Sequence, residues 1–135
     1  MKKVGEHVTI DFLGVKKEYS PDFYNKVIYK IAKKAKIEVL NISEKVFKPQ
    51  GYTCLALLAE SHMSFHTFPE RGIISFDFFT CGKISPTAAL EILKNEIKHA
   101  DLFFTADKIF LDKFLVPKVA YFAHFMSNPP ATPTI

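Results

Sequence analysis

Side chains that can act as nucleophiles, bases or acids are concentrated near the middle of the chain. The stretch 60–70, Glu-Ser-His-Met-Ser-Phe-His-Thr-Phe-Pro-Glu, and the run 79–82, Phe-Thr-Cys-Gly, together hold two serines, two histidines, two glutamates and one cysteine. A histidine base that activates a serine or cysteine is the machinery of many hydrolases, and histidines with a cysteine can bind zinc. This part of the sequence is therefore the first candidate for an active site.

A metal centre is one alternative, because His62 and His66 are four residues apart and Cys81 could join them. The segment has the pattern of a strand, in which the two histidines would lie about 13 Å apart. We therefore expect no metal site. A conventional hydrolase is a second alternative, although the chain lacks the Gly-x-Ser-x-Gly turn of one common class. The simplest alternative is a set of polar side chains on the open face of a sheet.

Three motifs in this region resemble the signature of the bacterial-type S-adenosylmethionine decarboxylase proenzymes. They are 60–62 (Glu-Ser-His), 66–70 (His-Thr-Phe-Pro-Glu) and 80–82 (Thr-Cys-Gly). The likeness continues upstream through 47–51 (Phe-Lys-Pro-Gln-Gly) and, more weakly, through 5–7 (Gly-Glu-His). It covers roughly residues 4–100, about 70% of the chain, and we find no likeness after about residue 105.

The resemblance implies a proenzyme that cuts its own chain. Ser61 Oγ would attack the carbonyl group of Glu60 and convert the peptide bond to an ester, and elimination would leave residue 61 as a pyruvoyl group. The products would be a β chain of residues 1–60 and an α chain of residues 61–135. The pyruvoyl group would form a Schiff base with the substrate, so the enzyme would need neither pyridoxal phosphate nor a metal.

The same resemblance implies roles for other residues. Cys81 would donate a proton to the substrate carbon that loses carbon dioxide, and His66 would accept a proton during processing. The family usually has serine at the position of Thr53, where it assists processing, so the extra methyl group could slow that step. Substrate binding would involve two aromatic side chains and one acid: Phe47, Phe68 and Glu70.

The residues by themselves leave other roles open. Cys81 would be a buried structural thiol, either phenylalanine could pack in the core, and Glu70 could be solvated in a turn. Cys54 lies inside an apolar run, so we assign it to the core.

Strand geometry adds a constraint on the site. Ser61 and His66 are five residues apart, so a regular strand points their side chains to opposite faces, and they should not meet within one chain. The resemblance implies sites at a dimer interface, where the partner's His66 could approach Ser61. We therefore predict a symmetric homodimer with two shared sites, (αβ)₂ after cleavage.

The implied reaction is decarboxylation of S-adenosylmethionine, which supplies the aminopropyl donor for spermidine synthesis. A pyruvoyl-dependent decarboxylase of ornithine or arginine is the enzymatic alternative. An uncleaved, non-catalytic homologue is the alternative outside enzymes.

Hydrophobic periodicity predicts the elements that position these residues. Apolar patterns predict strands at 7–15, 37–46, 53–59, 61–68, 73–80 and 102–111, with turns at 49–51 and 69–72. Ser20-Pro21 is typical of an N-cap and first helical residue, and Ser85-Pro86 predicts a second helix in the same way. The order predicts an α+β fold, a two-layer α/β sandwich with two helices on one face of a mostly antiparallel sheet.

Composition limits the kind of protein. The 135 residues, 48% of them hydrophobic, suit one domain, which we expect at 1–127, followed by a flexible proline-rich tail at 128–135. Two cysteines and no leader or apolar span predict a cytoplasmic protein. The first sixty residues hold eleven lysines against seven acids and so carry the whole net charge of +4. These lysines are scattered, so we expect neither a nucleic-acid nor a membrane partner.

Overall fold

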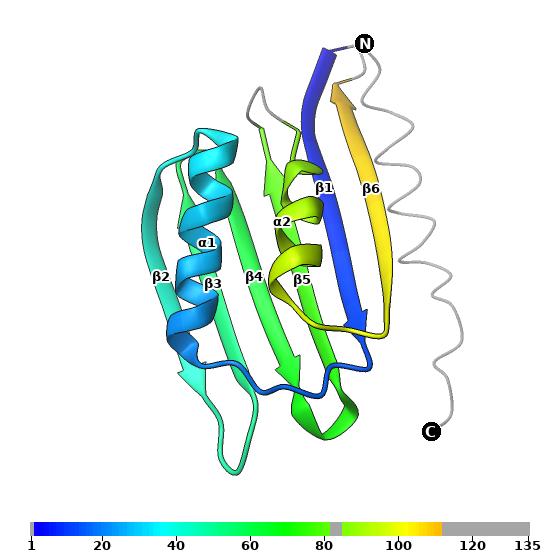
Figure 1. Ribbon diagram of the computed structural model, residues 1–135. Coiled ribbons are helices and arrows are strands. Elements are labelled where there is room, and N and C mark those ends of the chain that lie inside the picture. Colours follow the sequence, from blue (N-terminus) through cyan, green and yellow to red (C-terminus); the bar gives the residue numbers. More distant parts are fainter. Residues whose placement is uncertain (1, 82–84, 112–135) are drawn as a thin grey trace, which may run out of the picture.

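Six strands form one sheet, and two helices pack on one of its faces (Figure 1). The computed structural model describes residues 2–81 and 85–111. In chain order the elements are β1 (Lys2–Leu13), α1 (Pro21–Ala35), β2 (Val39–Val46), β3 (Tyr52–Leu58), β4 (Ser61–Phe68), the 3₁₀ turn η1 (Pro69–Arg71), β5 (Ile73–Thr80), α2 (Ala88–Glu96) and β6 (Asp101–Leu111). The strands lie in the order β2-β3-β4-β5-β1-β6, and each neighbouring pair is antiparallel. The predicted two-layer α+β sandwich is confirmed.

The first helix begins as its sequence predicts. Ser20 is the N-cap, and its Oγ accepts a hydrogen bond of 3.3 Å from the backbone N–H of Phe23. Pro21 occupies the first helical position, where its missing N–H costs nothing. Apolar side chains at helical spacing then pack on the sheet, among them Tyr24, Val27 and Ile31.

The second helix begins later than predicted. We expected Ser85 to be its N-cap, but α2 starts at Ala88, and Thr87 precedes it without a side-chain capping bond. Ser85 Oγ accepts the backbone N–H of Thr87 at 3.3 Å, ahead of the helix, and its hydroxyl donates to Glu6 Oε1 at 2.9 Å. Ser85 therefore closes a turn that precedes α2, and a buried carboxylate on a distant strand binds the same hydroxyl.

The sheet has two unlike faces, because side chains alternate along each strand. Toward the helices the central strands present apolar residues that are at most 3% exposed, namely Val8, Ile10, Phe12, Met63, Phe65, Ile74, Phe76 and Phe78. Neither described helix covers the other face (Figure 1). We call it the open face, and its central residues are His7, Thr9, Asp11, His62, Ser64, His66, Ser75, Asp77 and Phe79. The centre of the open face therefore carries mostly polar side chains, whereas the helix-covered face belongs to the hydrophobic core.

Two other points concern the extent of the chain. The predicted tail at 128–135 and the domain boundary before it lie outside the described residues. Neither helix in the described part has the length and apolar character that a membrane span requires.

Candidate active site

The junction between Glu60 and Ser61 lies in the tight turn that joins β3 to β4. Glu60 has a φ of 65°, in the left-handed region that residues other than glycine seldom adopt. Its carbonyl oxygen accepts a hydrogen bond from the backbone N–H of Cys81, with an N···O distance of 3.4 Å. Glu60 is therefore strained at its φ angle, and the carbonyl group that precedes Ser61 is polarised by a hydrogen bond.

Ser61 is the first residue of β4, and its side chain lies on the helix-covered side of the sheet. It is 8% exposed, and its Oγ donates to Thr80 Oγ1 at 2.8 Å. Thr80 is the last residue of β5 and lies directly opposite Ser61 in the β4–β5 pair. Cys81 follows at once, and its thiol is free and exposed. We call this group the cleavage end, after the cleavage predicted from the sequence, and it consists of Glu60, Ser61, Thr80 and Cys81.

The structure thus brings three predicted site residues together, Glu60, Ser61 and Cys81. It also separates the two cysteines as predicted, because Cys54 is 0% exposed in the core. The alternative of a buried structural thiol at Cys81 is wrong, since that side chain is exposed.

The remaining predicted residues lie toward the other end of the sheet, which we call the distal end. Thr53 and His66 are directly opposite each other in the β3–β4 pair, and Thr53 Oγ1 lies 3.2 Å from His66 Nδ1. Phe68 ends β4, and Glu70 follows in η1, where its Oε2 accepts a bond of 3.5 Å from Gln50. Phe47 lies between β2 and the turn at 49–51 and is 47% exposed.

The two ends are too far apart to act on the same atoms within one chain. Seven residues separate Ser61 from Phe68, which corresponds to about 23 Å along a strand. Ser61 also points to the helix-covered side, whereas His66 is exposed on the open face, as strand parity predicts. A single chain therefore does not assemble the complete set of predicted residues.

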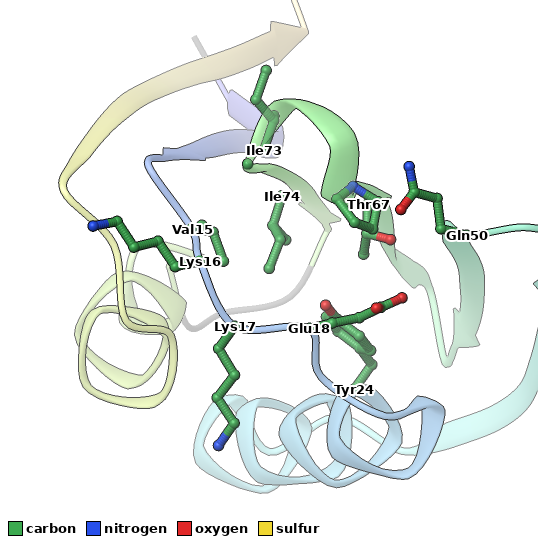
Figure 2. A pocket seen from close by; sticks show the side chains of 11 residues that line it. Val15, Lys16, Lys17, Glu18, Tyr24, Gln50, Thr67, Ile73 and Ile74 are labelled. Atoms are coloured by element: carbon green, nitrogen blue, oxygen red, sulfur yellow. The ribbon is translucent and has the colours of Figure 1, made fainter.

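A cavity of about 230 Å³ lies at the distal end, between α1 and the sheet. Figure 2 shows its lining, with Glu18 and Tyr24 facing Gln50 and Thr67 across the opening. Its lining contains no residue of the cleavage end. A separate hollow of about 290 Å³ on the open face is lined by Phe68, Arg71 and Phe103 together with neighbouring side chains.

Comparison with known proteins identifies the family. The family model described as "S-adenosylmethionine decarboxylase" matches residues 6–107. This chain belongs to the S-adenosylmethionine decarboxylase family.

Individual relatives of the family extend the match. The chain is 40% identical over 97 residues to the S-adenosylmethionine decarboxylase proenzyme of Brevibacillus brevis, covering 70% of this chain and 73% of that one. It is 38% identical over 136 residues to the corresponding proenzyme of Synechococcus sp. strain WH7803, covering 96% and 98%. The second alignment runs past residue 105, where we found no likeness from the motifs, and so corrects that limit.

The fold is also shared with a solved member of the S-adenosylmethionine decarboxylase family. The adenosylmethionine decarboxylase of Aquifex aeolicus superposes with a TM-score of 0.74 at 24% identity, covering 84% of this chain and 98% of that one. This likeness shows the fold.

The open face of the present chain holds a polar cluster that we did not predict from the sequence. Asp77 Oδ2 lies 2.9 Å from His7 Nε2 and 3.3 Å from His62 Nε2, while Ser64 donates to Asp77 Oδ1. The four residues come from β1, β4 and β5, so only the strand pairing brings them together. The alternation of polar residues in each strand was the available signal.

The cluster has the types of ligand that bind a divalent cation. The ligand atoms of His7, His62 and Asp77 lie within 4.8 Å of one another. Hydrogen bonds among these residues also satisfy the carboxylate without an ion. Among the described residues, neither His66 nor Cys81 joins such a set, so the metal arrangement considered from the sequence does not form.

Replacing Asp77 with asparagine should lower the free energy of unfolding by about 1–2 kcal/mol near neutral pH. Burial opposes ionisation of Asp77, but hydrogen bonds from Ser64, His7 and His62 outweigh it and lower the pKa of the carboxyl group. The folded pKa lies below the unfolded value, so this stabilisation is fully present above the ordinary aspartate pKa near 4 and is lost as the pH falls through the folded value.

Thermal unfolding of both proteins across pH measures this effect. The gap between wild type and Asp77→Asn should be widest near neutral pH and should narrow in acid. A gap that stays constant down to the acid limit would contradict the role given to the ionised carboxylate.

Proposed function

We propose that this chain is a self-processing, pyruvoyl-dependent decarboxylase that converts S-adenosylmethionine to decarboxylated S-adenosylmethionine, the aminopropyl donor for spermidine synthesis. Family membership and the names of its relatives support this substrate. The observation that carries the proposal is the meeting of the Ser61 hydroxyl, the Glu60 carbonyl and the Cys81 amide at the cleavage end.

Self-cleavage begins with the chain's own groups. Ser61 Oγ attacks the carbonyl carbon of Glu60, the carbon–nitrogen bond breaks, and the hydroxyl proton passes to the released amine. The Cys81 N–H already donates to the carbonyl oxygen on which negative charge develops, as an oxyanion donor does. The left-handed φ of Glu60 places backbone strain one residue before the attacking serine.

Elimination completes the cleavage. A base removes the Cα proton of residue 61, and the Glu60 carboxylate leaves with the electron pair of its bond to the side-chain carbon of residue 61. Water then replaces the nitrogen of residue 61, which departs as ammonia. We assign the base to His66, and Thr53, which lies 3.2 Å from its Nδ1, fixes the ring.

The mature site fits decarboxylation. The pyruvoyl group supplies a carbonyl that condenses with the substrate amine and takes up electrons as carbon dioxide leaves. Cys81 carries an exposed thiol next to residue 61 and delivers its proton to the substrate carbon. Phe47 and Phe68 offer exposed aromatic faces for an adenine ring, and Glu70 offers a carboxylate for the ribose hydroxyls.

A second copy of the chain supplies the distal end of each site. The open face carries exposed apolar side chains that a partner would cover, including Leu55, Leu57 and Phe103. Two open faces related by a two-fold axis across the strands place the cleavage end of one protomer over the distal end of the other. The partner's His66 then approaches residue 61 from the open face, where it serves as the base for the Cα proton and not for the buried Oγ, and the assembly is (αβ)₂ with two shared sites.

Intact-mass measurement of the purified protein tests self-cleavage. We expect two chains in place of one 15.4 kDa species, with the larger chain starting at residue 61 and lacking a free α-amino group. A single uncleaved species would support the non-catalytic alternative.

Carbon dioxide release tests the substrate. S-adenosylmethionine, ornithine and arginine should be compared at equal concentration, and we expect release from the first alone. Faster release from either amino acid would contradict the proposed substrate while leaving self-cleavage intact.

A further inference from the structure

A row of three polar side chains ends the apolar layer beneath the helices. Glu6, Thr80 and Ser61 lie on the neighbouring strands β1, β5 and β4, and Thr80 is directly opposite each of the other two. They are 3%, 2% and 8% exposed, respectively. Burying polar groups carries a free-energy cost unless they are hydrogen-bonded. This row is therefore held together by specific contacts.

Two sets of contacts hold members of this row. The Glu6 carboxylate accepts the Ser85 hydroxyl at 2.9 Å and pairs with Lys3 Nζ at 3.4 Å. The Ser61 hydroxyl donates to Thr80 Oγ1 at 2.8 Å. The O–H bond of Ser61 therefore points toward Thr80, and the lone pairs of its oxygen point elsewhere.

Consecutive groups at the end of β5 hold both reacting partners. The Thr80 side chain contacts the nucleophilic oxygen of Ser61, and the next backbone N–H, that of Cys81, contacts the carbonyl oxygen of Glu60. The two contacts share one short stretch of backbone, so the same strand end fixes the rotamer of the Ser61 side chain and the orientation of the Glu60 carbonyl group. Correct placement of reacting atoms can change rates by orders of magnitude.

We propose that the Thr80 hydroxyl is a catalytic residue of self-cleavage, which holds Ser61 Oγ with its proton directed away from the Glu60 carbonyl and its lone pairs available for attack. This inference rests on the proposed function and deepens it. The role is confined to the first step, in which the acyl group of Glu60 moves from nitrogen to Ser61 Oγ. Once Ser61 Oγ is part of the ester, it carries no proton. The resemblance to the family assigned no role to this threonine.

Replacing Thr80 with valine removes the hydroxyl and keeps the shape, and Thr80→Ser keeps the hydroxyl. We expect Thr80→Val to slow the appearance of the two chains about 10- to 100-fold, and Thr80→Ser to retain most of the rate. Cleavage is followed by intact mass after purification of the full chain. Equal rates for wild type and Thr80→Val, or equally slow cleavage of both variants, would overturn the proposal.

Thr67→Val is the matched control for lost stability. Thr67 is also a buried threonine on the helix-covered side, where its Oγ1 accepts the backbone N–H of Tyr52 at 2.9 Å. This variant should melt at a lower temperature than wild type and still cleave at the wild-type rate. Slow cleavage in Thr67→Val, matched to its loss of stability, would mean that Thr80→Val acts through stability and would overturn the proposal.

Hydroxylamine, which cleaves esters but not amides, locates the blocked step. Uncleaved Thr80→Val protein should resist hydroxylamine, because its peptide bond has not become an ester. Release of the α chain would place the block after the ester and would overturn the proposal. Wild type serves as the reference: if wild type itself never cleaves, the proposed function fails, whereas cleaving wild type with unaffected Thr80→Val refutes only the role of Thr80.

Discussion

Co-expressing Ser61→Ala chains with His66→Ala chains should produce cleavage and decarboxylase activity that neither variant shows alone. Ser61 and His66 point to opposite faces of β4 and lie five residues apart, so neither residue can serve the other within one protomer. In a mixed dimer, one site joins an intact Ser61 to the partner's intact His66, and the other site carries both lesions. Random pairing at equal amounts should restore about one quarter of the wild-type sites.

Mass identifies which chain is cut in the mixture. Only chains carrying His66→Ala retain Ser61, so only these should appear as two fragments. A chain with both substitutions, co-expressed with wild type, is the control, because neither site of that mixed dimer is intact and activity should fall. A mixture in which no chain is cleaved would contradict the shared site.

Replacing Cys81 with alanine should separate the two reactions of the protein. The Cys81 backbone N–H that binds the Glu60 carbonyl remains in the variant, so cleavage should proceed. The exposed thiol is lost, so turnover per cleaved chain should fall by about 100- to 10,000-fold, the range for loss of a general acid. Intact mass measures the first effect, and carbon dioxide release measures the second.

Cys54→Ala is the control for removing a thiol. Cys54 is fully buried in β3 and takes part in packing, so this variant should lose stability and keep its turnover per cleaved chain. An uncleaved Cys81→Ala protein, or one with wild-type turnover, would contradict the assignment of cleavage to the backbone N–H and of turnover to the thiol of this residue.

The sheet could be predicted because its signals are local. Alternation in 61–68 and 73–80 reproduces β4 and β5 at the same bounds, and the Ser20-Pro21 pair marks the start of α1. The start of α2 could not be predicted in this way, because Ser85 binds the backbone N–H of Thr87 in a turn, and the regular helix begins only at Ala88. The Ser-Pro pattern marks this turn and does not show where the regular helix starts after it.

A distinction between local signals and contacts distant in sequence applies to the site. Strand parity alone predicted that Ser61 and His66 face opposite ways, whereas the roles of Cys81 and Glu70 came from resemblance to a family. The contact between Ser61 and Thr80 depends on the register of β4 with β5, and the cluster around Asp77 depends on three strands at once. Neither register nor strand order could be read from one sequence without the fold.

If the chain is cut as proposed, the order of strands in the sheet determines whether the two fragments can separate. A cut after Glu60 assigns β1, β2 and β3 to one fragment and β4, β5 and β6 to the other, yet β1 lies between β5 and β6, and β3 pairs with β4. The fragments are therefore interdigitated, and three strand-to-strand ladders join them across the break. They cannot dissociate without unfolding, and once denatured they must find each other by a second-order encounter. Renaturation of the cleaved protein should therefore depend on concentration, even within a single protomer.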